Sequence, residues 1–184
     1  PDLIAEKLKS MEFGLETSFL KNIVGLDATW YKNDSENLIS NVLVSYASGT
    51  TLQKQNIGNL RTEAFELSLR VTPIKSQDFS WNLVANWSNP KTTVTALKNG
   101  VDNLALQTNT SQGGVTLNAP LGGLYGTIYG TDFIYAPDGQ KVIDPDTGAY
   151  MKTTSTNNNL GSYQAQWFGG LRNTITYKNV SLSF

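Results

Sequence analysis

Residues 11–19 read Met11-Glu12-Phe13-Gly14-Leu15-Glu16-Thr17-Ser18-Phe19, an alternation of apolar and polar side chains that only Thr17 interrupts. Three further segments, 24–31, 65–72 and 79–88, keep the same period. A period of two residues places each set on one face of a β-strand. We therefore expect four strands, each with one apolar and one polar face. The charged residues of these segments all fall on the polar face: Glu12, Glu16, Asp27, Glu66 and Arg70.

The connections between these strands alternate in length. Residues 20–22 and 73–78 are short turns, whereas 32–64 and 89–166 are long and polar. Short turns on one side and long loops on the other are typical of a transmembrane β-barrel. Aromatic residues at the strand ends fit the girdles that barrels place at both membrane interfaces. They are Trp30, Tyr31 and Trp87 on the loop side, and Phe19, Phe79 and Tyr177 on the turn side.

The pattern also predicts how much of a barrel is present. Pro73 should end the third strand, because proline cannot donate a hydrogen bond to the ladder. Two more strands are expected at 169–177 and 180–184. The resulting total of about six strands is fewer than the roughly 8 that a single-chain barrel needs, and the chain begins at Pro1 with no signal peptide. We therefore expect an all-β fold, an antiparallel transmembrane β-barrel segment that belongs to a larger barrel.

The composition excludes several classes of function. The net charge of −1 gives no reason to expect nucleic-acid binding. The chain has no cysteine and no histidine, which excludes a thiol nucleophile, a histidine-based triad and a zinc site of the Cys/His type. No stretch approaches the roughly 18 apolar residues of a membrane helix.

The sequence predicts neither an enzyme nor a cofactor or metal site. Glu12 and Glu16 would lie roughly 13 Å apart along a strand, farther than the spacing of about 5–9.5 Å between glycosidase carboxylates. We expect them to pair with neighbours such as Arg70 instead. Residues 144–148 resemble the start of a calcium loop, but Ser155 stands where that loop needs its last glutamate. A plain turn is favoured there.

The segment 89–166 carries the candidate binding residues. Its glycine-rich part, 122–130, could present Tyr125 and Tyr129 to sugar rings or to a partner protein, or could pack these tyrosines within the loop. Trp167, at the end of the segment, is either a girdle residue or a ligand platform. Short hairpins are expected at 125–135 and 140–151, and the other long connection contains an apolar patch at 42–47.

Several stretches resemble a known family. Residues 10–16 (SMEFGLE) resemble the S-x-E-x-G-x-E strand of TonB-dependent outer-membrane transporters, and residues 25–31 (GLDATWY) resemble the G-L-D-x-x-Y-Y strand that follows it. The segments at 63–67, 72–73 and 79–81, and the run at 167–183, resemble the SusC-like class (starch-utilisation or RagA-type) in particular. These matches occur in order along most of the chain.

The resemblance implies a barrel of about 22 strands with a plugged lumen, in the outer membrane of a Gram-negative bacterium of the Bacteroidota type. Such transporters import oligosaccharides or peptides with a SusD-like surface lipoprotein as a lid, driven by the TonB complex. Residues 1–184 would be a C-terminal part of the barrel without the plug, with 32–64 and 89–166 as extracellular loops. Membrane lipid would contact the apolar set. The lumen would be faced by Glu12, Glu16, Asp27, Glu66, Arg70, Ser80, Asn82 and Asn86.

Two other readings of the same alternation stay open. A soluble β-sandwich, such as a glycan-binding module of a surface protein, also alternates apolar and polar residues along its strands. It would have to pack the apolar faces against each other in a closed core. A small complete barrel that serves as a structural anchor is disfavoured by the strand count.

Overall fold

The computed structural model describes residues 3–43, 52–98, 100–107 and 114–184, and every regular element within these ranges is a β-strand. None of these residues forms a helix long and apolar enough to cross a bilayer. The chain divides into two compact units. We call Lys7–Glu36, Arg61–Thr92 and Ala165–Phe184 the wall unit, and Pro1–Glu6, Asn37–Leu60 and Thr93–Gln164 the loop unit.

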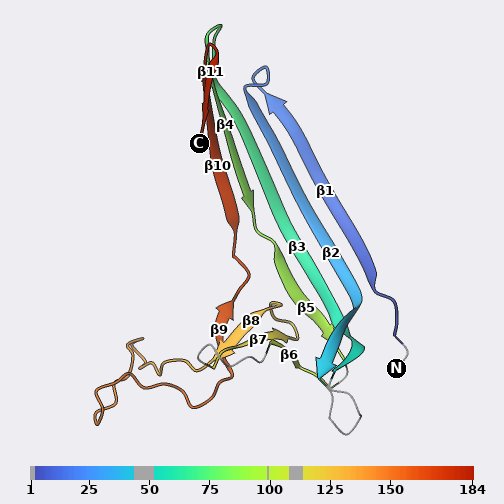
Figure 1. Cartoon of the computed structure of the whole chain (residues 1–184), viewed down its shortest axis with the longest axis vertical. Helices are drawn as coiled ribbons and strands as arrows, with labels where there is room; N and C mark the ends of the chain where they lie inside the picture. Colours follow the sequence, from blue (N-terminus) through green and yellow to red (C-terminus); the bar gives the residue numbers. More distant parts are fainter. Residues whose placement is uncertain (1–2, 44–51, 99, 108–113) are drawn as a thin grey trace. The chain divides into compact units, whose positions relative to one another are not determined.

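The wall unit is built on a sheet in the order β1-β2-β3-β4-β10-β11, whose strands run side by side in Figure 1. The described neighbours pair in antiparallel fashion, and β5 (Lys91–Leu97) pairs with β3. Within the described residues the sheet is open, with β1 and β11 at its edges. All six expected strands are confirmed. Their bounds are β1 Lys7–Phe19, β2 Val24–Leu43, β3 Leu52–Lys75, β4 Phe79–Ser88, β10 Phe168–Tyr177 and β11 Val180–Ser183.

Two of the three short turns between neighbouring wall strands, β1–β2 and β10–β11, lie where they were expected. Leu20, Lys21 and Asn22 all have positive φ angles, of 53°, 57° and 68°, and the Ile23 amide donates to the Leu20 carbonyl at 3.2 Å. Residues other than glycine rarely adopt this left-handed backbone conformation, and asparagine is among those that tolerate it best. The β10–β11 turn uses Lys178 at φ 50°.

Two sequence expectations about strand length were wrong. β3 does not end before Pro73 but continues to Lys75, with a register shift between Val71 and Ile74. The shift is a bulge, where a residue without an N–H costs no ladder bond. Most of 32–64 is not a loop either, because β2 runs to Leu43 and β3 begins at Leu52. Residues 44–51, and with them most of the expected patch at 42–47, lie outside the described residues.

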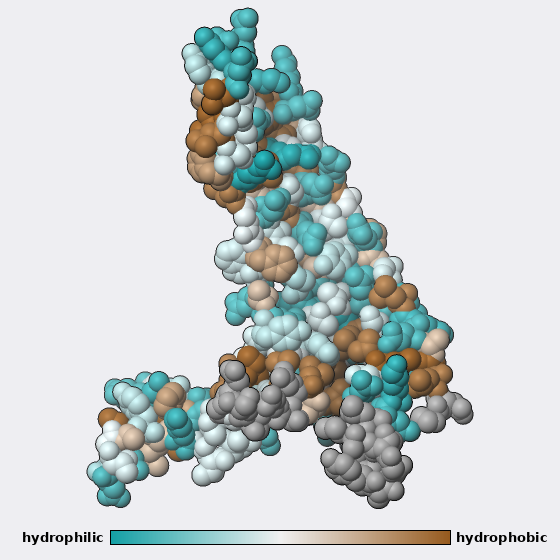
Figure 2. Space-filling view, viewed as in Figure 1, coloured by the Kyte–Doolittle hydropathy of each residue, from teal (hydrophilic) through white to brown (hydrophobic). Residues whose placement is uncertain are grey.

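The strand registers gather the apolar side chains of the wall unit on one face. Phe13 lies opposite Trp30, and Leu67 lies opposite Trp87. These side chains remain in contact with solvent: Phe13 is 65% exposed and Leu171 is 60% exposed. Figure 2 shows hydrophobic residues grouped along the part of the sheet where β4, β10 and β11 lie. We call the face that carries these side chains the apolar face. Its apolar members are Met11, Phe13, Leu15, Phe19, Val24, Leu26, Ala28, Trp30, Phe65, Leu67, Leu69, Val71, Phe79, Trp81, Leu83, Ala85, Trp87, Leu171, Ile175, Tyr177, Val180 and Leu182.

The loop unit contains a second antiparallel sheet, in the order β6-β7-β8-β9. Its core is small: Val94 is 0% exposed and Ala119 is 1% exposed, and Ile57 is also buried. The Val94 amide donates to the Gly123 carbonyl at 2.9 Å, which ties the glycine-rich stretch to β5. The sheet's strands are β6 Asn103–Gln107, β7 Thr116–Pro120, β8 Thr127–Gly130 and β9 Asn158–Ser162.

Of the two hairpins expected in 89–166, one is confirmed and one is wrong. The hairpin at 140–151 exists, since Ile143 pairs with Tyr150. Residues 125–135 do not pair with each other. Instead β8 pairs with β7 on one side and with β9 on the other. β9 is contributed by residues about thirty positions later in the chain, so local sequence patterns cannot reveal this pairing.

Candidate functional site

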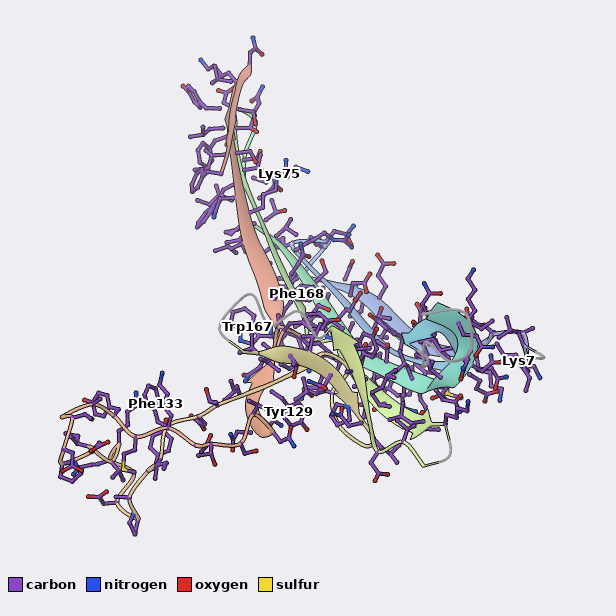
Figure 3. All side chains as sticks on the ribbon, turned by 60° about the horizontal axis from the view of Figure 1, so that its bottom comes forward. Lys7, Lys75, Tyr129, Phe133, Trp167 and Phe168 are labelled. Atoms are coloured by element: carbon purple, nitrogen blue, oxygen red, sulfur yellow. The ribbon has the colours of Figure 1, made fainter. Side chains whose placement is uncertain are left out.

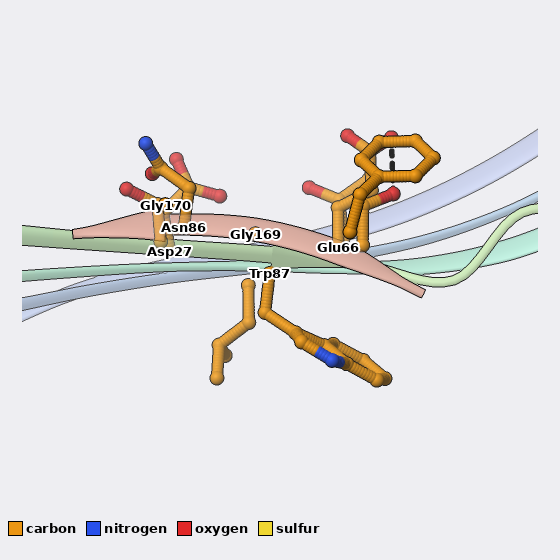
Figure 4. A pocket seen from close by; sticks show the side chains of 11 residues that line it. Asp27, Glu66, Asn86, Trp87, Gly169 and Gly170 are labelled. Carbon is orange, nitrogen blue, oxygen red and sulfur yellow. Dashed lines mark hydrogen bonds between the residues drawn. The ribbon is translucent and has the colours of Figure 1, made fainter. Parts of the chain in front are cut away.

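The polar residues of the wall-unit strands share the face opposite the apolar one. Figure 4 shows Asp27, Glu66 and Asn86 on one side of the sheet and Trp87 on the other. The registers extend this grouping across neighbouring strands, with Glu16 opposite Asp27. We call this the polar face, and it contains all the residues predicted for it: Glu12, Glu16, Asp27, Glu66, Arg70, Ser80, Asn82 and Asn86.

Arg70 neutralises one carboxylate of the polar face. Its Nη2 lies 3.1 Å from Glu16 Oε1, which confirms the expected pairing. Both side chains are exposed, and an exposed ion pair contributes only about 0–1 kcal/mol to stability. On the same face the Thr72 hydroxyl donates to Asn82 Oδ1 at 2.9 Å. These contacts hold side chains in place without creating a reactive pair.

A groove of about 610 Å³ lies along the polar face, within the usual range of about 300–1,000 Å³ for ligand sites. The Ser88 hydroxyl donates to Glu66 Oε1 at 3.3 Å, and Tyr31 makes a side-chain hydrogen bond to the same carboxylate. The lining comes from β2, β3, β4 and β10: Asp27, Thr29, Glu66, Leu67, Ser68, Asn86, Trp87, Ser88, Phe168, Gly169 and Gly170.

Sequence reasoning found only part of this groove. Asp27, Glu66 and Asn86 were expected on the polar face, but Ser88 and Phe168 were not singled out. Phe168 was missed because the fifth strand was expected to begin at Gly169, whereas β10 begins at Phe168. Successive residues of a strand point to opposite faces. Counting back in steps of two from Arg172 would therefore have placed the Phe168 ring on the polar face.

The three candidate loop contacts divide between the units. In the loop unit Tyr125 is half-buried and lines a small cavity with Ile57 and Val94. Burial raises the pKa of the Tyr125 hydroxyl, and Tyr163 adds to the rise. Tyr129, in β8, is also half-buried and lies opposite Thr116. Contact of either tyrosine with cargo or with a partner stays a prediction.

Trp167 belongs to the wall unit. It directly precedes Phe168, the first residue of β10 (Figure 3). Its side chain is 60% exposed, so it is available either to a membrane interface or to a ligand. Both roles stay predictions.

The calcium-like stretch at 144–148 is a hydrogen-bonded turn. Asp144 Oδ1 accepts from the backbone amides of Asp146 at 2.9 Å and of Thr147 at 3.3 Å. These bonds lower the pKa of the Asp144 carboxyl, the bond from the Asp146 amide most. The carboxylate therefore serves the turn itself, and the described residues contain no cluster of three acidic, histidine or cysteine side chains.

Comparison with known proteins identifies this arrangement of strands. The family described as TonB dependent receptor-like, beta-barrel, matches residues 1–184. The chain belongs to this family, and its open antiparallel sheet is a segment of the family's β-barrel. The expected resemblance to SusC-like transporters is confirmed by the relatives that follow.

Two curated relatives carry the family name. TonB-dependent receptor P26 of Formosa agariphila is 25% identical over 200 residues, which cover 100% of this chain and 20% of the relative. TonB-dependent receptor SusC of Bacteroides thetaiotaomicron is 31% identical over 100 residues, which cover 53% of this chain and 10% of SusC. The chain thus spans about a fifth or less of the length of these relatives.

The fold has a solved counterpart. The structure of the RagAB peptide transporter superposes with a TM-score of 0.74 at 23% sequence identity, covering 97% of this chain and 20% of that chain. The RagAB importer in its open-open state gives the same TM-score over 100% of this chain. At this level of identity the likeness establishes the fold.

Proposed function

We propose that this chain forms part of the barrel wall of a SusC-like outer-membrane importer in a Bacteroidota-type bacterium. The observation that carries the proposal is the exposed apolar face of the wall unit. Soluble monomers rarely leave a continuous apolar patch of more than a few hundred Å² in water. A hydrocarbon environment removes this cost, and β4 and β10 have ten residues each, a length that suits a bilayer crossing of about 9–11 residues.

Aromatic pairs support a membrane boundary at one level of the sheet. The Phe13 and Trp30 rings stack with centroids 5.9 Å apart, and the Phe65 and Trp87 centroids are 6.3 Å apart. Aromatic rings favour membrane interfaces. Trp30 does not stand at a strand end, as was expected, because β2 continues to Leu43.

Beyond these rings the outward side of the sheet changes character. Along β2 the positions that share a face with Trp30 become charged, namely Lys32, Asp34 and Glu36. Arg61 Nε lies 2.6 Å from Asp34 Oδ1, and Lys9 pairs with Glu36. Charged side chains on a lipid-facing surface would be costly. The switch from apolar to charged residues therefore supports a membrane boundary at the aromatic pairs, with the polar face directed into the barrel lumen.

The soluble-sandwich alternative has less support. A sandwich buries the inner faces of its sheets against each other. Among the described residues of the wall unit, Ala64 is the one apolar side chain that is buried. The family match over the whole chain also favours a barrel.

Partners and cargo follow by analogy with the relatives. TonB dependence is part of the names of both curated relatives, and the RagAB structures are of a peptide transporter. We infer import of peptides or oligosaccharides, with a SusD-like lipoprotein as a lid over the long loops. The energised step would use the TonB complex and a plug domain that these strands do not contain.

Fractionation of the source cells tests the proposal. An antibody against 114–164 should detect, in the outer membrane, a band several times larger than the 20.1 kDa of this chain. The band should migrate differently when the sample is not boiled, as folded barrels do. A soluble band near 20.1 kDa that does not respond to heating would overturn the proposal and favour the sandwich module.

A further inference from the structure

An aromatic ring and a carboxylate lie in the same row across the polar face. Ser88 of β4 lies opposite Glu66 of β3 and also opposite Phe168 of β10. Adjacent strands are about 4.8 Å apart, so Glu66 and Phe168 stand on the two sides of Ser88, within reach of one bound group. The Phe168 side chain is exposed. It is an aromatic residue on a face where the other β10 residues are glycine, arginine and threonine.

The Glu66 carboxylate is held in a defined orientation. Ser88 is buried, with 9% exposure, and its hydroxyl donates to Glu66 Oε1 at 3.3 Å. The next row along the strands pairs Ser68 with Asn86 and Asn86 with Gly170. A Cβ atom added at Gly170 would meet nothing within 4 Å. The glycine therefore leaves open space beside the carboxylate and the ring.

The groove is negatively charged. Its charged lining residues are Asp27 and Glu66. The two arginines of the polar face have partners outside the groove. Arg70 forms an ion pair with Glu16. Arg172 Nε donates to the Ser183 hydroxyl at 3.0 Å. Carboxylates attract a cation by charge, and an aromatic ring attracts one through its quadrupole. Both groups therefore favour the same kind of ligand.

We propose that this groove binds a cationic side chain of imported peptide, the guanidinium of arginine or the ammonium of lysine, between the Glu66 carboxylate and the Phe168 ring. The proposal rests on the proposed function, because it assigns the polar face to the lumen. It names peptide rather than neutral oligosaccharide as the cargo class, because a cationic side chain gains a charge–charge attraction to Asp27 and Glu66 that a neutral sugar lacks. Ser88 is a positioning residue that acts through Glu66.

Calorimetric titration of the purified full-length transporter tests the proposal. The probes are an eight-residue glycine-serine peptide with one central arginine, the same peptide with neutral, isosteric citrulline in place of arginine, and maltoheptaose. We expect the arginine peptide to bind at least tenfold more tightly than the citrulline peptide. Glu66→Gln should abolish this preference, and Phe168→Leu should reduce it about threefold while keeping an apolar side chain.

Glu63→Gln is the matched control, because it removes the same charge from the same strand on the opposite face. It should change the affinity for the arginine peptide less than twofold. Equal affinity for the two peptides, equal losses in the Glu66 and Glu63 variants, or Glu66-dependent binding of maltoheptaose would each overturn the inference. If the transporter is found in the outer membrane but the peptides bind equally, this inference alone fails, whereas its absence from the outer membrane removes the proposed function as well.

Discussion

The wall unit and the loop unit both contain antiparallel sheets, but they differ in how far their apolar side chains are buried. The loop unit encloses Val94 and Ala119 almost completely, whereas the wall unit leaves Phe13 and Leu171 largely exposed. Three strands that lie wholly within the wall unit, β1, β4 and β10, have 13, 10 and 10 residues, against 4 or 5 in each of β6 to β9. The difference indicates two solvents: water around a small packed core, and hydrocarbon against one face of a sheet.

The largest expected effect tests which face of the wall unit meets lipid. Leu69→Arg places a charge on the apolar face opposite Ala85, farther from the boundary at the aromatic pairs, where arginine near the bilayer midplane costs about 2–4 kcal/mol. We expect this variant to be nearly absent from the outer membrane in the heat-modifiability assay. Ser68→Arg, one residue earlier on the polar face, should assemble. Equal assembly of the two variants would refute the assignment of the faces.

A second substitution should damage the loop unit alone. Gly126 has φ +84°, and a Cβ atom there would lie 1.7 Å from Tyr163 Cε1. Gly126→Ala should therefore destabilise the loop unit by more than the roughly 1 kcal/mol of an ordinary left-handed alanine. We expect faster proteolytic cleavage and faster amide exchange within 114–164, with normal assembly of the barrel.

Gly139→Ala is the control for this prediction. Gly139 has nearly the same φ, +83°, but nothing lies within 4 Å of the added Cβ. It carries the backbone cost without the collision, so it should accelerate cleavage clearly less than Gly126→Ala does. Equal acceleration by both alanines would show that Tyr163 does not pack over Gly126 as described.

The smallest expected effect concerns a polar residue within the apolar face. Asn173 lies opposite Leu83, and its Oδ1 accepts from Trp81 Nε1 at 3.1 Å. Trp81→Phe removes this donor and should destabilise the barrel by about 1–3 kcal/mol, because an acceptor is left unpaired. Adding Asn173→Leu should restore most of the loss, measured as the temperature at which the heat-modifiable band converts. If the second change adds to the loss, the hydrogen bond is not the cause.

The sequence predicted the wall unit well because its two faces differ so strongly. Every wall strand was placed, and so was the polar set that includes Asp27 and Glu66. The extensions of β2 and β3 were missed because polar side chains such as Lys32 and Arg61 appear there on the outward side as well, which removes the period-two contrast.

The loop unit and the groove were less predictable. β8 pairs with β7 and β9, and pairing between short strands so far apart in sequence leaves no local periodicity to detect. The groove depends on a row formed by Glu66, Ser88 and Phe168 from three strands, and a single sequence carries no record of register. Tyr125, Tyr129 and Trp167 could be named as candidates, but their partners could not.

The turn between β1 and β2 also bears on the register in which these two strands pair. Its three residues occupy the left-handed region, so the turn has few alternative shapes of similar energy. A slip of one residue would have to rebuild that turn, and it would also rotate every side chain of β1 to the other face, directing Glu12 and Glu16 toward lipid. The turn therefore helps to fix the register of the β1–β2 pair, and with it the face of the sheet that carries Glu12 and Glu16.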